Sequence, residues 1–435
     1  MRTPMAGGWC VTLLCLILVL PRYLEGQDPA TSDTVLARLT AEAVAANPAI
    51  ASRRALAVAA TARVRAAGAL PDPMLNLGVM DLTLPHFGFR ESDFTEVDVE
   101  LSQEFPWPGT LGARTAAARA AAQARGADVD ARQRDVIVRT AELYYRLRYL
   151  VTARATLDRQ RDLLSAGVEI STTRYATTTA PQSDPLQARV ALSRLDAEGA
   201  DLAAQEAEVR ARLRALRNVA GPDSLSVEPI RPELVLAEAE STAAVGGDGA
   251  VASPASDSLS EHPRLAARRA EIEAAEQTAR VERLGARPDF TVMTRYGARP
   301  LGSDFFSAFV GVRIPLYAGR KQLRLADAAR ADADAARAAL AGEQADLAEE
   351  IRAVQAQIGA EATRLRLLAG QVVPAAQAIV DASLRGYRVG KVEFLTVLAT
   401  EDALYRARLD AARVAAEYLT HLVAREQLVA PEDAQ

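Results

Sequence analysis

The chain has 435 residues, of which 25% are charged and only 5% aromatic, and its formal net charge at pH 7 is -5. This charge is modest and no basic run is interleaved with aromatic residues, so the composition does not indicate a nucleic-acid partner. The abundance of alanine and arginine is typical of long, closely packed helices with solvated outer faces rather than of a compact leucine and phenylalanine core.

The chain begins with a segment that reads as a targeting signal. The apolar run 11–20 is too short to cross a bilayer as a helix, and we expect residues 1–26 to be a secretory signal peptide, with an uncleaved anchor helix as the alternative. Both cysteines, Cys10 and Cys15, lie in this segment, so the mature chain is expected to carry no disulfide. We expect no membrane-spanning helix after it, so any membrane contact would be made by strands.

Two similar segments follow the signal. Pro48 and Pro263 are 215 positions apart, and Tyr175 and Tyr387 are 212 apart. Each copy reads as a helix, two short strands, a very long helix, a turn and a helix, and a period this long predicts a duplicated domain rather than a solenoid. The predicted division is a first repeat at 27–218, a connector rich in Pro, Gly, Ser and Ala at 219–261 with a short helix near 232–239, a second repeat at 262–430 and a tail at 431–435.

Four segments alternate apolar and polar residues with the period of a β-strand: 74–79, 94–105, 290–296 and 306–316. They approach the roughly 9 to 11 residues that a tilted strand needs to cross a hydrocarbon core, and aromatic residues stand near their ends. Glu96, Asp98 and Glu100 share one face of the second segment, and Arg313 lies on the polar face of the last. We expect these four side chains to line a water-filled lumen; the alternative is a soluble sheet with one solvated face.

Four strands cannot close a barrel alone, because the smallest bacterial outer-membrane barrels have about eight. Unpaired strand edges are not tolerated in lipid. If the strands cross a membrane, the barrel must therefore be shared between chains.

The helices are unusually long. No proline occurs from about Gly109 to Ser165, which predicts roughly 85 Å of helix at 1.5 Å per residue. The counterpart in the second repeat begins near Arg320 and runs past Pro374 to Leu384. Return helices are predicted at 184–218 and 393–428. Apolar residues recur at spacings of three and four, which indicates amphipathic hairpins; an ordinary coiled-coil hairpin is the alternative.

A resemblance to a known family rests on the order, spacing and duplication of three short segments: the strand-to-helix junctions 103–109 and 310–319, and the turn 386–390. By these segments the chain resembles the TolC family of outer-membrane efflux channels over about 41–430. The resemblance implies a mainly α fold with transmembrane β structure. In a homotrimer, twelve strands would lie in the outer membrane of a Gram-negative cell and twelve helices would form a tunnel (α-barrel) through the periplasm. It also implies a tripartite efflux system with a periplasmic adaptor protein and an inner-membrane pump. The Pro106–Gly109 junction is most similar to the branch that serves heavy-metal pumps.

The resemblance further implies roles for residues at the periplasmic tip. Asp184 and Tyr387 match a contact that keeps the family's best-known member closed. Thr396 and Ala399 stand where that member has a ring of aspartates, and Glu393 is a candidate substitute one turn earlier. The expected gate comprises Asp184, Tyr387, Glu393 and Thr396. The expected adaptor-docking residues, where the family pattern survives only in part, are Thr177, Thr178, Val389, Gly390 and Lys391.

Other classes of protein fit less well. No phosphate-binding glycine loop, Gly-x-Ser-x-Gly turn or catalytic His and carboxylate cluster occurs, so we expect no enzyme and no cofactor. The three histidines are scattered and suggest no metal site. The remaining alternatives are a periplasmic coiled-coil adaptor, which would have a single hairpin, a secreted structural rod, and a channel for type I protein secretion.

Overall fold

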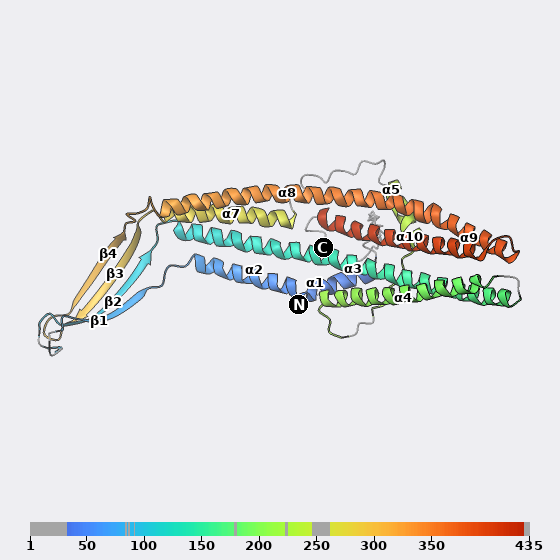
Figure 1. Cartoon of the computed structure of the whole chain (residues 1–435). Coiled ribbons are helices and arrows are strands. Elements are labelled where there is room, and N and C mark those ends of the chain that lie inside the picture. The colour runs from blue at the N-terminus through green and yellow to red at the C-terminus, as the bar shows by residue number, and fades with distance from the viewer. Residues whose placement is uncertain are drawn as a thin grey trace, which may run out of the picture.

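The computed structural model describes residues 33–82, 85, 88–90, 92–177, 181–221, 225–245 and 262–429. The predicted signal peptide with both cysteines, the tail and Thr178 lie outside these ranges. The molecule is long, with a sheet at one end and two helical hairpins at the other (Figure 1). Its elements are α1 (Thr34–Ala46), α2 (Pro48–Ala67), β1 (Met74–Met80), β2 (Glu96–Phe105), α3 (Thr110–Ala176), α4 (Ser183–Leu216), α5 (Pro232–Val245), α7 (Pro263–Leu284), β3 (Asp289–Ala298), β4 (Phe305–Arg313), α8 (Gln322–Leu367), a π turn (Leu368–Val372), α9 (Val373–Arg388) and α10 (Phe394–Val429).

The four strands form one antiparallel sheet in the order β1-β2-β3-β4. Its register separates apolar from polar side chains, because residues directly opposite one another share a face. One row across the sheet is Leu77, Val99, Tyr296 and Phe306, and the next is Asn76, Glu100, Arg295 and Ser307. The apolar face is exposed to the surroundings, with Leu77 at 75% exposed and Phe306 at 70%. The predicted alternation is confirmed.

The last strand is shorter than predicted. It was expected to reach Leu316, but β4 ends at Arg313. Pro315 has no N–H to donate to a strand ladder, so the paired strand stops before it.

The first long helix, α3, has 67 residues and is therefore about 100 Å long. It was predicted to end near Ser165, and it continues to Ala176. Along its length it packs against α2 and α7 near the sheet, and against α4 and α10 toward the hairpin ends (Figure 1). The main core lies between α3 and α10, where Tyr145 and Leu147 meet Val414 and Leu419. Buried alanines on α10 allow the close approach that the composition indicates: Ala411, Ala412, Ala415 and Ala416.

The second long helix runs without interruption from Gln322 to Arg388 and contains the π turn Leu368–Val372. Pro374 is the second residue after this turn. A proline in a helix has no N–H to donate and its ring displaces a carbonyl group of the preceding turn, which accounts for the wider π turn before it. Gly370 lies in the turn, and a Cβ there would be 3.7 Å from Leu236 of α5. The connector helix α5 thus packs closely against the irregular turn.

This helix also corrects one expectation. It is long and apolar enough to cross a membrane by length and composition, with a window of mean hydropathy 1.3 that is only 17% buried. We had expected no such segment after the signal. In the fold the helix packs along α7 and α10, as a member of the bundle.

The two repeats begin with the same kind of helix cap. Asn47 Oδ1 accepts a hydrogen bond from the Ala49 N–H (2.9 Å), and His262 Nδ1 accepts one from the Arg264 N–H (3.3 Å); a proline is the first helical residue in both. Burial above all, with the cations Arg134 and Arg264 nearby, lowers the pKa of His262 to about 4. The imidazole is therefore neutral at neutral pH, and its Nδ1 can act as the cap acceptor.

This cap predicts a pH-dependent stability. The pKa of His262 is about 4 in the folded state and about 6.5 in the unfolded state. The stabilisation is complete above about pH 6.5 and declines as the pH falls toward 4, by up to about 3 kcal/mol. Denaturant unfolding at several pH values should show this loss in the wild type. In His262→Asn, which keeps the cap of the first repeat, the loss should be smaller; an unchanged pH dependence in this variant would contradict the assignment.

Candidate functional site

The α9–α10 turn lies at the hairpin end of the molecule, opposite the sheet (Figure 1). Gly390 has a φ of +73°, its N–H donates to the Tyr387 carbonyl (3.0 Å), and the Lys391 N–H donates to the Gly386 carbonyl (2.9 Å). This is a Schellman motif, which favours glycine at its left-handed position. A Cβ on Gly386 would be 2.5 Å from Val392 Cγ2, so a glycine is needed there as well. These contacts explain the glycines of the turn 386–390.

Tyr387 joins the two hairpins at this tip. It is only 8% exposed and packs in one apolar cluster with Ala188 of α4 and with Phe394 and Val397 of α10. Its ring centroid is 5.5 Å from that of Phe394, and the Arg174 guanidinium of α3 lies 4.7 Å from the Tyr387 ring centroid on its face. The tyrosine therefore contacts helices from both repeats, partly through a cation–π interaction.

No hydrogen bond joins Asp184 to the Tyr387 hydroxyl in the part of the chain that the structure describes, and the predicted contact between these two residues stays a prediction. Within the described part of the chain the Tyr387 hydroxyl is buried without a hydrogen-bonding partner. Asp184 is half-buried in the first turn of α4, one turn before Ala188, and accepts a hydrogen bond from the Ser183 hydroxyl (3.4 Å). A carboxylate in a first turn is stabilised by the helix dipole. The side-chain contacts of Tyr387 in this structure are therefore made by its ring.

The other predicted tip residues lie on the surface. Glu393 and Thr396 are exposed at the start of α10 and just before it. Thr177, Val389 and Lys391 are exposed at the two hairpin turns, as expected for a docking surface. Their roles in gating and docking stay predictions.

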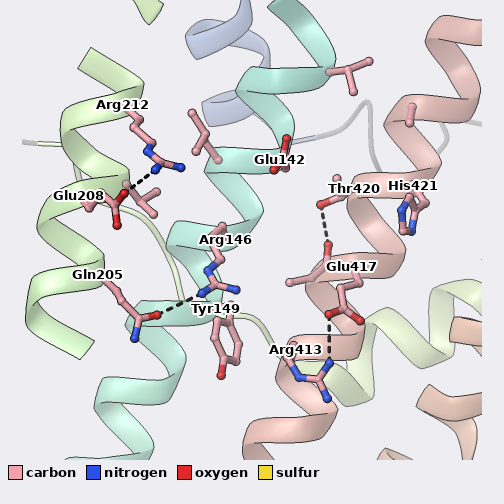
Figure 2. A pocket seen from close by; sticks show the side chains of 15 residues that line it. Glu142, Arg146, Tyr149, Gln205, Glu208, Arg212, Arg413, Glu417, Thr420 and His421 are labelled. Atoms are coloured by element: carbon pink, nitrogen blue, oxygen red, sulfur yellow. Dashed lines mark hydrogen bonds and ion pairs between the residues drawn. The ribbon is translucent and has the colours of Figure 1, made fainter. Parts of the chain in front are cut away.

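A groove between α4 and α10, with α3 as its floor, was not predicted from the sequence. Near the tip it encloses about 650 Å³ and includes Leu186, Val190 and Leu395, which are exposed apolar residues. Farther from the tip it encloses about 570 Å³ and has charged walls (Figure 2). A sequence signal that could have predicted this groove is a row of charged residues that runs along α3, α4 and α10 beside their buried apolar positions.

The charges in the part of the groove farther from the tip are already paired. Arg212 bonds Glu208 on α4, Arg146 of α3 donates to Gln205 (3.1 Å), and Arg413 pairs with Glu417 on α10 (3.1 Å) (Figure 2). His421 Nδ1 lies 2.9 Å from both carboxylate oxygens of Glu361 on α8, and this contact raises the pKa of His421. Over the described residues no group of His, Cys, Asp and Glu is arranged to hold a metal ion.

The polar face of the sheet carries a compact cluster of charges. Glu96 and Asp98 are each only 6% exposed. Arg295 pairs with both of them, at 3.4 Å from Asp98, and Arg299 lies 3.5 Å from Glu96. Glycines on the neighbouring strands leave room for this arrangement, because a Cβ at Gly78 would be 2.6 Å from Asp98 Oδ1. Glu96 and Asp98, which were predicted to line a lumen, are therefore held in ion pairs on the polar face of the sheet.

The remaining two predicted lining residues are more accessible. Glu100 is half-buried and accepts a hydrogen bond from Asn76 (3.1 Å). Arg313 is exposed at the helix-proximal end of β4, where it pairs with Glu104 and with Asp289 (3.2 Å). That these residues line a lumen stays a prediction.

Comparison with known proteins gives a family match over most of the chain. Residues 39–219 and 255–430 match the family model described as "Outer membrane efflux protein". The cobalt-zinc-cadmium resistance protein CzcC of Cupriavidus metallidurans is 27% identical over 256 residues, which cover 57% of this chain and 56% of that protein. The matched region thus spans just over half the length of this relative.

Solved structures show the same fold. The outer membrane protein VceC from Vibrio cholerae superposes with a TM-score of 0.75 at 20% identity, covering 91% of this chain and 96% of that one. CusC has a TM-score of 0.77 at 15% identity, with 92% and 93% covered. The CmeC outer membrane channel of Campylobacter jejuni has a TM-score of 0.73 at 13% identity, with 91% and 85% covered.

Proposed function

The chain belongs to the outer membrane efflux protein family, and from this premise we propose that three copies form the outer-membrane channel of a tripartite efflux system. The observation that carries the proposal is the sheet. One of its faces is apolar and exposed, and the opposite face is charged. Among the residues that the structure describes, its outer strands β1 and β4 each have one edge without a partner strand. A sheet with these properties suits a wall between lipid and water.

Three copies would satisfy the open edges. If β4 of one copy pairs with β1 of the next, the four strands of each chain contribute to a closed barrel of twelve. Channels of the TolC family form such trimers within tripartite efflux systems. The long helices, about 100 Å in the case of α3, would then continue the barrel as a tunnel across the periplasm.

The hairpin tip is proposed to be the gate and the adaptor-docking surface. The Tyr387 cluster holds the α3–α4 and α9–α10 hairpins together, and Asp184, Glu393 and Thr396 lie around it. Exposed Thr177, Val389, Gly390 and Lys391, together with Thr178, would meet a periplasmic adaptor, which links the channel to an inner-membrane pump. Opening then requires that the two hairpins separate at Tyr387.

The trimer is tested by the mass of the mature protein extracted in mild detergent from an outer-membrane fraction. Light scattering with the detergent contribution subtracted should give three chains. A soluble monomer or dimer released from the periplasm would overturn the proposal and favour a coiled-coil interaction protein.

The cargo is proposed to be metal ions. The support is the likeness to CzcC, whose name refers to cobalt, zinc and cadmium resistance. A channel does not need a binding site for the ions that pass through it. The charged face of the sheet would give such ions a polar path. Zinc and cadmium tolerance of the native host should fall on deletion of the gene and return with the intact chain; unchanged tolerance, with increased drug sensitivity, would reassign the cargo to organic molecules.

A further inference from the structure

We propose that the junction between the helices and the sheet binds the headgroups of anionic glycerophospholipids in the periplasmic leaflet of the outer membrane. We define this junction, the collar, by its exposed cations Arg114, Arg287, Arg320 and Lys321, together with Trp107, Leu316 and Tyr317. The inference rests on the proposed function, because it requires that the sheet lie in a membrane.

The collar lies at the boundary of the apolar face of the sheet. The outward residues of β4 and the segment after it are Phe306, Ala308, Val310, Val312, Ile314 and Leu316. From Phe306 to Leu316 this run spans at most about 34 Å, or about 24 Å when tilted by about 45°, which is close to the height of the apolar band of outer-membrane barrels. Leu316 and Tyr317, 82% and 73% exposed, therefore mark the edge of the hydrocarbon. Arg320 and Lys321 follow within four residues.

Contacts between helix ends bring the collar cations to one level. A Cβ at Gly285, just after α7, would be 3.8 Å from Gln322 at the start of α8. A Cβ at Gly109, just before α3, would be 4.0 Å from Leu284 at the end of α7. The starts of α3 and α8 and the end of α7 thus meet next to the sheet, where the strands join the helices (Figure 1).

Arg287 is held at the same interface by aromatic rings. Its guanidinium lies 5.8 Å from the Trp107 ring centroid, and Trp107 stacks on Phe290 of β3 with centroids 5.9 Å apart. The backbone N–H of Trp107 donates a hydrogen bond to Asp289 Oδ1 (2.9 Å), which fixes the segment between β2 and α3 against the start of β3. A tryptophan beside an arginine at the end of an apolar band is typical of the membrane–water interface.

The collar has excess positive charge. Across the described ranges, Arg114, Arg287, Arg320 and Lys321 form no ion pair, and the first turns of α3 and α8 contain no acidic residue. By contrast, the next arginines along α8 are paired: Arg324 with Asp327 (3.5 Å) and Arg330 with the same carboxylate (3.0 Å). Of the carboxylates close to these helix ends, Glu104 and Asp289 pair with Arg313 and Asp327 pairs with Arg324, while Asp72 and Glu282 balance only part of the collar charge.

Lys and Arg side chains at the level of the headgroups bind anionic lipids in preference to zwitterionic ones. Each such cation raises the affinity of the protein for anionic lipid about fivefold at ordinary salt. Guanidinium groups also bind phosphate oxygens in bidentate geometry. The collar should therefore retain phosphatidylglycerol or cardiolipin in preference to phosphatidylethanolamine.

The test compares lipid retention by two triple variants of the full-length protein, each losing three positive charges. Arg287→Gln/Arg320→Gln/Lys321→Gln alters the collar, and Arg189→Gln/Arg352→Gln/Arg385→Gln removes exposed cations of α4, α8 and α9. Each protein is reconstituted in nanodiscs of phosphatidylethanolamine and phosphatidylglycerol (3:1), transferred to detergent, and analysed for bound lipid by native mass spectrometry. The lipid bound to the wild type and to the control variant should be enriched in phosphatidylglycerol relative to the nanodisc. For the collar variant, the ratio of bound phosphatidylglycerol to phosphatidylethanolamine should be at least tenfold lower.

Two outcomes would overturn the inference. The first is equal phosphatidylglycerol enrichment in the collar variant and the wild type, both recovered as inserted oligomers. The second is full displacement of the lipid by inorganic phosphate at constant ionic strength, which would indicate a simple anion site. Failure to recover an inserted oligomer of the wild type would instead refute the proposed function.

Discussion

Tyr387→Ala should open the periplasmic tip and make cells that express the protein permeable to bulky antibiotics. The substitution removes the ring that joins α3, α4, α9 and α10. Truncating a buried aromatic side chain costs about 3 to 5 kcal/mol, and the cation–π contact with Arg174 is lost as well. The measurement is antibiotic uptake in cells, together with single-channel conductance in planar bilayers, where the open fraction should rise.

Two control variants make this prediction specific. Tyr387→Phe should stay closed, because the hydroxyl that it removes has no hydrogen-bonding partner in the described structure. Tyr175→Ala changes the counterpart of Tyr387 in the first repeat, which is 44% exposed, and should not leak. If Tyr387→Phe and Asp184→Ala leaked as strongly as Tyr387→Ala, a direct contact between Asp184 and the Tyr387 hydroxyl would have to form in the closed channel.

Arg295→Leu should strongly destabilise the sheet. Glu96 and Asp98 are buried on its polar face and share this arginine, so its loss leaves two buried carboxylates of which only Glu96 has another cation, Arg299. Breaking a buried ion pair by removing one partner costs about 3 to 5 kcal/mol. The yield of protein in the outer membrane, and the denaturant concentration at which the extracted oligomer dissociates, should both fall.

A rescue experiment separates charge from packing. Adding Glu96→Gln and Asp98→Asn to Arg295→Leu removes the unpaired charges and should restore most of the lost stability. Glu100→Gln serves as the control, because Glu100 is only half-buried and a glutamine can still accept from Asn76. If the triple variant were as unstable as Arg295→Leu alone, the effect of Arg295 would lie in its packing against Phe305.

The fold could be predicted from the sequence because its signals are local. Alternation with a period of two defines the strands and their faces, and the long stretches without proline define the helices. The family suggested by these features is confirmed by the match over both repeats. The helix α3 continues past its predicted end near Ser165, although Gly167 follows and glycine often ends a helix. In the structure Gly167 stays helical, and a Cβ at this position would be only 3.7 Å from the Phe394 ring.

The tip could be predicted only in part. Its position follows from the turns, but the environment of Tyr387 depends on Arg174, which is 213 residues away in the chain. The partner of a buried hydroxyl depends on such long-range packing, which a sequence pattern does not contain. The same holds for Glu96 and Asp98, whose pairing with Arg295 requires the register between β2 and β3.

The open edges of β1 and β4 have a consequence for the order of events after synthesis. A newly exported chain should form its helices before it meets another copy, since α3 packs against α4, α7 and α10 of its own chain. Its sheet, however, has two edges that no other described strand of the chain covers, and such edges can pair with another extended chain. Assembly should therefore be concentration-dependent and slower than helix formation, and the unassembled protomer should be the species that periplasmic chaperones bind and proteases degrade.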